Sequence, residues 1–120
     1  MIPMDVFNIT ELIKRQERSD RSYLEFFRAD SLSLGVYRLA AGARDPQQPH
    51  GEDEVYYVAG GRGSITVGAQ DRPVEPGDIV FVRAGVEHRF HSVTEDLTLL
   101  VFFAPAEYTA AEENKNHGPR

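Results

Sequence analysis

The sequence predicts an all-β protein in which short antiparallel strands form a sandwich or a closed barrel. Turn-forming glycines and prolines recur at short intervals through the middle of the chain, from Gly42 to Gly85. Between them lie short segments rich in β-branched and aromatic residues, which favour strands. Closely spaced strands separated by Gly and Pro are typical of sandwiches and barrels, and not of alternating strand–helix units.

Six segments of the sequence are predicted to be strands. They span residues 32–39, 54–58, 64–67, 79–82, 88–93 and 97–103. Apolar side chains occur on both parities of many of these segments, so both faces of the strands are expected to be buried. One face would line a barrel interior, and the other would pack against a second sheet or a partner subunit.

One helix is predicted close to the start of the chain. Asn8 is a favourable N-cap, and Glu11 three residues later completes a pair that resembles a capping box. Ile9, Leu12 and Ile13 then share one face at the spacing of an amphipathic helix. We expect this helix to cover the outside of the sheet.

The length and composition are those of one globular domain. A chain of 120 residues, 41% of them hydrophobic, can bury a single core. We divide it into an N-terminal helical segment (1–22), the barrel (23–104) and a polar C-terminal tail (105–120). The tail is expected to be helical for a turn or two and then frayed.

Charge and composition exclude several classes of function. A net charge of −6 argues against nucleic-acid binding, which needs a basic face. The absence of cysteine excludes disulfides and thiolate metal sites. No apolar stretch approaches the about 20 residues of a membrane helix, and no secretory signal is present at the N-terminus. We therefore expect a cytoplasmic protein without nucleic-acid or membrane partners.

Candidate chemistry centres on two of the four histidines, His50 and His88. Residues two apart on a strand point to the same face, so Gln48 lies on the face of His50 and Phe90 on the face of His88. If these faces meet inside a barrel, two imidazoles, an amide and a carboxylate converge. Two histidines and one carboxylate with open positions typically hold non-haem Fe(II), and Zn, Mn or Ni also accept this set.

These residues fall into two motifs, and through them the chain resembles a small single-domain bacterial cupin. The first motif is matched by Gly42, Gln48, His50, Glu54 and Gly61, with Gln48 replacing the family's first histidine. The second motif is matched by Gly77, Gly85 and His88, with Arg83 and Ser92 replacing the family's proline and asparagine. The resemblance implies a double-stranded β-helix, the jelly-roll barrel of cupins, with about eight or more strands.

The resemblance also implies one divalent metal ion per subunit, with Fe, Zn, Mn and Ni as the candidates. His50, Glu54 and His88 would hold it, and Gln48 would take the fourth position. A neutral amide oxygen is a weaker donor than imidazole toward these metals. Gln48 therefore either ligates the metal or its water, or marks a member of the family whose metal site is weakened or lost.

Three further residues are candidates for the site. Tyr56 shares the face of Glu54, so its hydroxyl is a candidate acid/base, although the ring can equally serve as wall. Phe90 is a candidate for the apolar lining of a ligand pocket. Arg38 is a candidate clamp for a substrate carboxylate, and an ordinary solvated arginine is its alternative.

The function implied is a metal-dependent enzyme acting on a small organic molecule, in which the metal polarises substrate oxygens or binds O2. Dioxygenase or oxidoreductase chemistry is favoured slightly over isomerase, lyase or cyclase chemistry. The alternative is a non-catalytic cupin that binds a small ligand. We also expect a homodimer, because segments 23–27 and 97–103 carry more apolar surface than one barrel interior absorbs.

Overall fold

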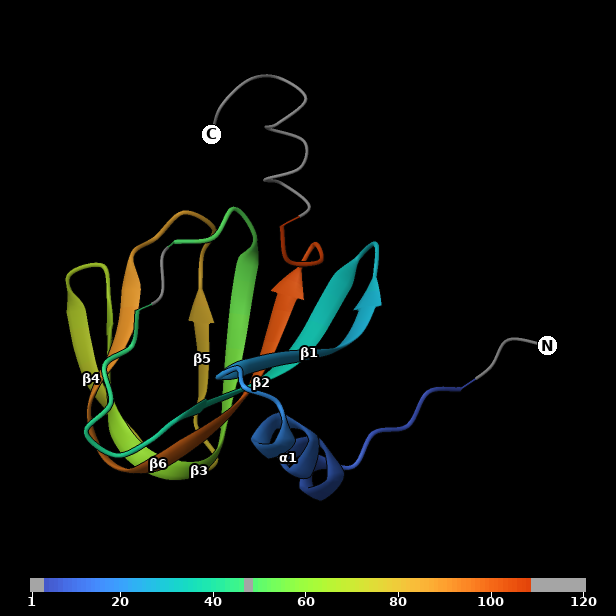
Figure 1. Ribbon diagram of the computed structural model, residues 1–120. Coiled ribbons are helices and arrows are strands. Elements are labelled where there is room, and N and C mark those ends of the chain that lie inside the picture. The colour runs from blue at the N-terminus through green and yellow to red at the C-terminus, as the bar shows by residue number, and fades with distance from the viewer. Residues whose placement is uncertain (1–3, 47–48, 109–120) are drawn as a thin grey trace.

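The computed structural model describes residues 4–46 and 49–108, and within them it shows one helix and six strands (Figure 1). The elements are α1 (Ile9–Arg18), β1 (Tyr23–Ala29), β2 (Leu32–Leu39), β3 (Asp53–Val67), β4 (Gln70–Val74), β5 (Ile79–Val82) and β6 (His88–Ala104). The expectations for Gln48 and for residues 109–120 lie outside the described residues.

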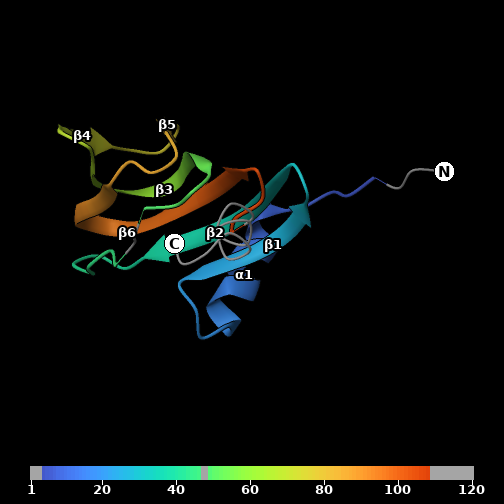
Figure 2. The same ribbon diagram turned by 90° about the horizontal axis from the view of Figure 1, so that it is seen from above.

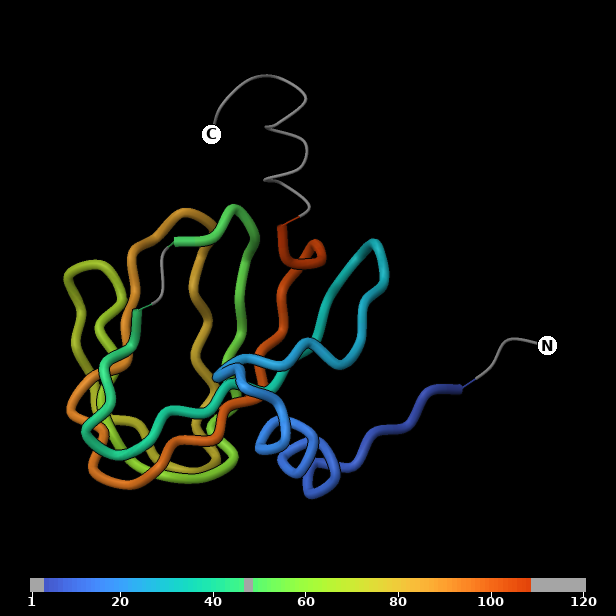
Figure 3. Tube along the Cα trace, in the orientation of Figure 1, coloured from blue at the N-terminus to red at the C-terminus, as the bar shows by residue number. Residues whose placement is uncertain are grey.

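The strands form one antiparallel sheet in the order β1-β2-β6-β3-β4, and β5 pairs with β3 beside this path. Figure 2 shows how the sheet bends, with β4 and β5 to one side of β6 and β1 to the other. The two longest strands, β3 and β6, pair along most of their length (Figure 3). The predicted all-β barrel with a short N-terminal helix is confirmed.

The strand pattern differs from the prediction in β3 and β6. Each merges two predicted strands into one, so the described residues hold six strands where about eight or more were expected. The pairing of β3 with β6 shifts register between Val58 and Ser64, where the glycines that were taken as turns form irregularities within the strand. Gly61 has φ +89°, and a β-carbon there would collide with the backbone of Asp96. Glycine is therefore required at this bend.

Two strands were not among the predicted segments. β4 carries Asp71, Arg72 and Pro73, which disfavour strands by propensity. It forms because it pairs antiparallel with the end of β3 at the edge of the sheet, where proline is tolerated. β1 pairs with β2 through a register shift between Glu25 and Phe27, which obscures its alternation.

The helix α1 begins where the capping residue predicted. The side chain of Asn8 accepts a hydrogen bond from the backbone N–H of Glu11 at 3.2 Å. Leu12 is buried, and Gln16 donates from Nε2 to the carbonyl of Arg21 at 2.9 Å, which fastens the end of the helix to the start of β1. Within the described residues, no helix has the length and apolarity that crossing a bilayer requires.

The buried core lies on the inner face of the bent sheet, next to the candidate site. It is built from buried side chains of β2, β3, β5 and β6, with Val74 of β4. Its most deeply buried members are Tyr56, Val58, Val82, Phe90, Leu97, Leu99 and Val101. Because alternate residues of a strand point inward, polar residues of the same parity near the strand ends reach this interior.

Candidate functional site

Glu54 and His88 meet inside the barrel although they lie near the starts of different strands. Glu54 is on β3 and faces inward with the same parity as Tyr56, while His88 is the first residue of β6. The bend of the sheet carries the start of β6 across the interior. The two loops that lead into β3 and β6 are also held together, because the backbone N–H of Gly85 donates to the carbonyl of His50 at 2.7 Å.

His88 is oriented by contacts on both ring nitrogens. Its Nδ1 lies 2.9 Å from the carbonyl oxygen of Val86, which can only accept, so Nδ1 carries a hydrogen. Its Nε2 lies 3.0 Å from Oε1 of Glu54 and 3.0 Å from the hydroxyl of Tyr56. Neutral His88 therefore directs the lone pair of Nε2 at these two groups, which is the tautomer that a metal ligand needs.

The surroundings of His88 raise the pKa of its imidazole. Burial by itself lowers the pKa of the imidazole, but this effect is outweighed. The close contact with Glu54 and the hydrogen bond to the carbonyl of Val86, together with the negative charges of Glu54 and Asp45, raise the pKa above its usual value. The site thus attracts positive charge.

Glu54 is the group in this site that most needs a partner. Its side chain is 1% exposed, and neither carboxylate oxygen has a hydrogen-bond partner of good geometry among the described residues, although Oε1 is 3.0 Å from Nε2 of His88. A buried carboxylate without partners is costly. Oε1 of Glu54 and Nε2 of His88, 3.0 Å apart, are the two atoms that would hold a cation here.

His50 lies at the same interior but is turned toward another residue. Its Nδ1 is 3.5 Å from Oε2 of Glu107, and its ring packs on Phe103 with centroids 4.8 Å apart. The ring centroids of His50 and His88 are 6.2 Å apart. In the part of the chain that the structure describes, no three His, Asp or Glu side chains are gathered as a preformed metal site. The structure thus pairs Glu54 with His88 and leaves His50 nearby.

A cavity of about 360 Å³ opens beside this group. Its lining residues come from β1, β2, β3, β6 and the loops around them: Tyr23, Tyr37, Pro46, Pro49, His50, Glu54, Val101, Phe103, Glu107 and Tyr108. The volume is that of a pocket for a small molecule. Glu54 and His50 therefore belong both to the candidate metal centre and to the wall of a ligand cavity.

Glu107 is a site residue that the sequence did not reveal, since it was assigned to the polar tail. Its backbone N–H donates to Oγ of Ser33 at 2.9 Å, and its carbonyl accepts from Arg28 at 2.8 Å. Burial, followed by the negative charges of Glu25, Glu54 and Glu52, raises the pKa of Glu107 to about 7. Nothing in the local sequence distinguishes this glutamate from the other charged residues of the C-terminal segment.

The two residues predicted to contact substrate do not line the cavity. Arg38 donates from Nε to Thr98 and from a terminal nitrogen to Glu17 of α1, at 3.1 and 3.0 Å. Its neighbour Tyr37 lines the cavity, so strand alternation turns Arg38 toward the helix. Phe90 is 1% exposed and packs edge-to-face on Tyr56, with centroids 4.9 Å apart. It supports the site from the core.

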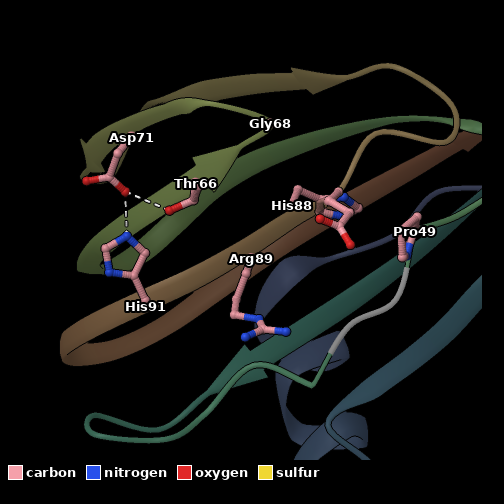
Figure 4. Close-up of a pocket in the computed structure, with 8 residues that line it drawn as sticks. Pro49, Thr66, Gly68, Asp71, His88, Arg89 and His91 are labelled. Carbon is pink, nitrogen blue, oxygen red and sulfur yellow. Dashed lines mark hydrogen bonds and ion pairs between the residues drawn. The ribbon is translucent and has the colours of Figure 1, made fainter.

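A larger depression, of about 490 Å³, is lined by His88 and by Pro49, which also borders the smaller cavity (Figure 4). At its far end His91 contacts Asp71 at 2.5 Å, and Thr66 donates to the same carboxylate at 2.8 Å. The side chains of this His91–Asp71 pair are partly exposed and satisfy one another. We place the candidate site in the smaller cavity, because that is where the unpartnered buried carboxylate lies.

A bent antiparallel barrel with an inward His–carboxylate pair beside a small-molecule cavity defines a class of small β-barrel ligand-binding and enzyme domains. Comparison with known proteins identifies the class: the sequence profile of the Cupin domain matches residues 35–103. The chain belongs to the cupin family.

Several proteins are similar to this chain. An uncharacterised protein of Streptomyces coelicolor is 46% identical over 104 residues, which are 87% of this chain and 99% of that protein. The DMSP lyase DddQ of Ruegeria pomeroyi is 28% identical with a TM-score of 0.60; the match covers 63% of this chain and 39% of that lyase. A Thermus thermophilus protein of known structure is 24% identical with a TM-score of 0.70, and the match covers 86% and 99% of the two chains. A predicted oxalate decarboxylase of Thermotoga maritima is 21% identical with a TM-score of 0.61, covering 69% and 78%.

Proposed function

We propose that this cupin is a metal-dependent enzyme acting on a small organic molecule. The observation that carries the proposal is Glu54, whose buried carboxylate lacks hydrogen-bond partners at 3.0 Å from Nε2 of His88. Glu54 and Nε2 of His88 would hold a divalent cation, and the Nδ1–H contact of His88 with Val86 keeps Nε2 available for it. The donor set of imidazole and carboxylate suits Fe, Zn, Mn or Ni.

His50, Glu54 and His88 are the proposed ligands, and Gln48 is the proposed fourth. For His50 to join them, its imidazole has to exchange Glu107 for the metal. A bound divalent ion would supply Lewis acidity to a substrate oxygen. The chain itself would supply the proton-handling group: the hydroxyl of Tyr56, 3.0 Å from Nε2 of His88, is the proposed acid/base.

Within the reaction classes expected from the sequence, we propose lyase-type chemistry ahead of dioxygenation. The enzyme named among the similar structures at 28% identity is a lyase, and Tyr56 provides a buried group for proton transfer. The test is to screen the metal-loaded protein against small organic acids and amino compounds, both in air and under argon. Turnover that persists without O2 is the expected result, whereas turnover that requires O2 would instead establish the oxygenase.

The alternative function is a non-catalytic cupin that binds a small ligand with a weakened metal site. The contact of His50 with Glu107 favours it, because the described residues do not hold three ligands in a preformed set. A protein that binds ligands from the same screen, retains no metal after purification and turns none of them over would establish this alternative.

A further inference from the structure

The cavity beside the candidate metal centre is negatively charged by its own side chains. Two carboxylates, Glu54 and Glu107, line it, and among its described lining residues none is Lys or Arg. Two more buried carboxylates stand behind the wall. Asp45 accepts from the hydroxyl of the lining residue Tyr37 at 2.7 Å, and Glu52 accepts from the backbone N–H of Tyr108 at 3.1 Å.

Nearby arginine does not offset this charge inside the cavity. Arg28 lies close, but it donates to the carboxylate of Glu25 at 2.9 Å and to the backbone carbonyl of Glu107 at 2.8 Å. Its charge is therefore paired with Glu25, outside the cavity lining. Glu54 would be engaged as a ligand of the divalent metal, so the other carboxylate of the lining is Glu107, whose contact with His50 at 3.5 Å would be given up when His50 turns to the metal.

Aromatic rings form a large part of the remaining wall, beside Pro46, Pro49 and Val101. Tyr23 contacts Tyr37 and Phe103 with ring centroids 6.4 and 6.2 Å apart. His50 extends this row from Phe103 to Tyr108, with centroids 4.8 and 6.2 Å apart. Aromatic faces attract alkylammonium groups through their quadrupoles, and rings that stand beside a carboxylate form the usual cage for such cations.

Some polar atoms of the lining residues make no hydrogen bond within the described structure. The hydroxyl of Tyr23 is buried and has no hydrogen-bond partner in the described structure, and the same is true of both oxygens of Glu54. Glu54 is 1% exposed. Both residues line the cavity, so a ligand bound there is placed to supply the missing hydrogen bonds.

We propose that the substrate or ligand of this cavity is a small organic cation, an amine or quaternary ammonium compound whose charged nitrogen sits between the carboxylate of Glu107 and the rings of Tyr23, Phe103 and Tyr108. The proposal rests on the function proposed above in placing the ligand in this cavity, and it adds the charge class. Carboxylate substrates without a positive charge are disfavoured, because they would face Glu107 with no arginine to bind them.

The test uses three ligands of nearly equal shape: benzylammonium, benzyl alcohol and benzoate. Their affinities are measured by calorimetry on the full-length protein after removal of metal, at about pH 8 where carboxylates are ionised. We expect benzylammonium to bind at least about fivefold more tightly than either of the others, since charge complementarity sets specificity. A smaller preference, or a preference for benzoate, would overturn the proposal.

A substitution of Glu107 tests whether its charge causes the preference for benzylammonium. Glu107→Gln retains the shape of the side chain and removes its charge, so the preference for benzylammonium over benzyl alcohol should fall by at least about threefold. Glu75→Gln is the matched control, because it removes an equal charge from the surface, where Glu75 pairs with Arg62. An unchanged preference in Glu107→Gln, or an equal loss in Glu75→Gln, would contradict the assignment.

The failure of this inference can be distinguished from failure of the proposed function. Metal content and affinity are measured on the same preparations before the metal is removed. Cation binding without any metal affinity would leave the inference standing and overturn the metal-dependent enzyme. Tight metal binding without the preference for benzylammonium would overturn the inference about the ligand and leave the metal-dependent enzyme standing.

Discussion

The ring of Tyr23 lies directly over Gly35 of the neighbouring strand β2, where a β-carbon would collide with the phenol ring. The register pairs Tyr23 with Tyr37 and Gly35 with Glu25, so the aromatic side chain crosses the sheet diagonally to reach the bare backbone. The absence of a side chain at Gly35 thus leaves room for the ring of Tyr23, which lines the cavity. This glycine is explained by its close approach to Tyr23.

Substitution of Gly35 should therefore lower the stability of the fold. In Gly35→Ala the ring of Tyr23 has to move, and overpacking of this kind costs about 1–3 kcal/mol. The free energy of unfolding, measured with urea, should fall by that amount. Gly60→Ala is the control, because its added β-carbon would meet nothing nearer than 3.9 Å. Equal stabilities for the two variants would show that Tyr23 is not held as described.

The His91–Asp71 pair predicts a pH dependence of stability. Hydrogen bonds from His91 and Thr66 hold the pKa of Asp71 below its usual value. Folded Asp71 therefore releases its proton more readily than unfolded Asp71 and stabilises the fold above the unfolded pKa of about 3.9. This contribution is lost as the pH falls through the lower folded pKa.

Asp71→Asn should accordingly be less stable than the unsubstituted protein at about pH 5, and the gap should close toward about pH 2.5. Thermal unfolding followed by circular dichroism at both pH values measures the gap. Asp20→Asn, which changes an exposed carboxyl between α1 and β1, serves as the comparison. A gap for Asp71→Asn that does not change with pH would refute the role given to this carboxylate.

An apolar patch on the outer face of the barrel predicts a homodimer. Ile79 and Phe81 of β5 are 69% and 56% exposed. The register places Tyr57 beside Ile79, and Val55 between Phe81 and Phe102, so these side chains form adjoining rows across β5, β3 and β6. A surface that is apolar and extends over three strands suits the same surface of a second copy about a two-fold axis.

Light scattering at micromolar concentration should show a dimer for the unsubstituted protein and a monomer for Phe81→Glu. Val6→Glu, which changes an apolar residue that is 80% exposed before α1, should remain dimeric. A monomer in every case would remove the patch as an interface, and a dimer in Phe81→Glu would move the interface elsewhere.

The sequence identified the parts of the fold and site that depend on local spacing. Strand alternation placed Glu54 and Tyr56 on one inward face, and the Asn8 cap marked the start of α1. The second motif placed His88 at the start of an inward strand. The glycines near the middle of β3 were assigned to a turn, because bulges and turns use the same residue.

What the sequence could not reveal depends on contacts between distant segments. Glu107 enters the cavity because its backbone N–H reaches Ser33, 74 residues earlier in the chain. Tyr23 enters it because Gly35 leaves room on the next strand. Arg38, which strand alternation turns away from the cavity, finds its carboxylate partner in Glu17 of the helix, 21 residues earlier in the chain. No periodicity within a strand encodes such pairings, since they arise only when the sheet bends.

The measurement that tests the central claim most directly is the metal content of the purified protein and of His88→Ala, determined by elemental analysis after equilibration with Zn²⁺ or Mn²⁺ and dialysis. Tyr56→Phe is the control, because it removes the other group that contacts Nε2 of His88 without removing a proposed ligand. We predict about one metal ion per subunit in the unsubstituted protein and in Tyr56→Phe, and little in His88→Ala, since loss of one of three or four ligands greatly weakens the site. Equal metal content in His88→Ala and the unsubstituted protein would contradict the assignment of Glu54 and His88 as a metal centre.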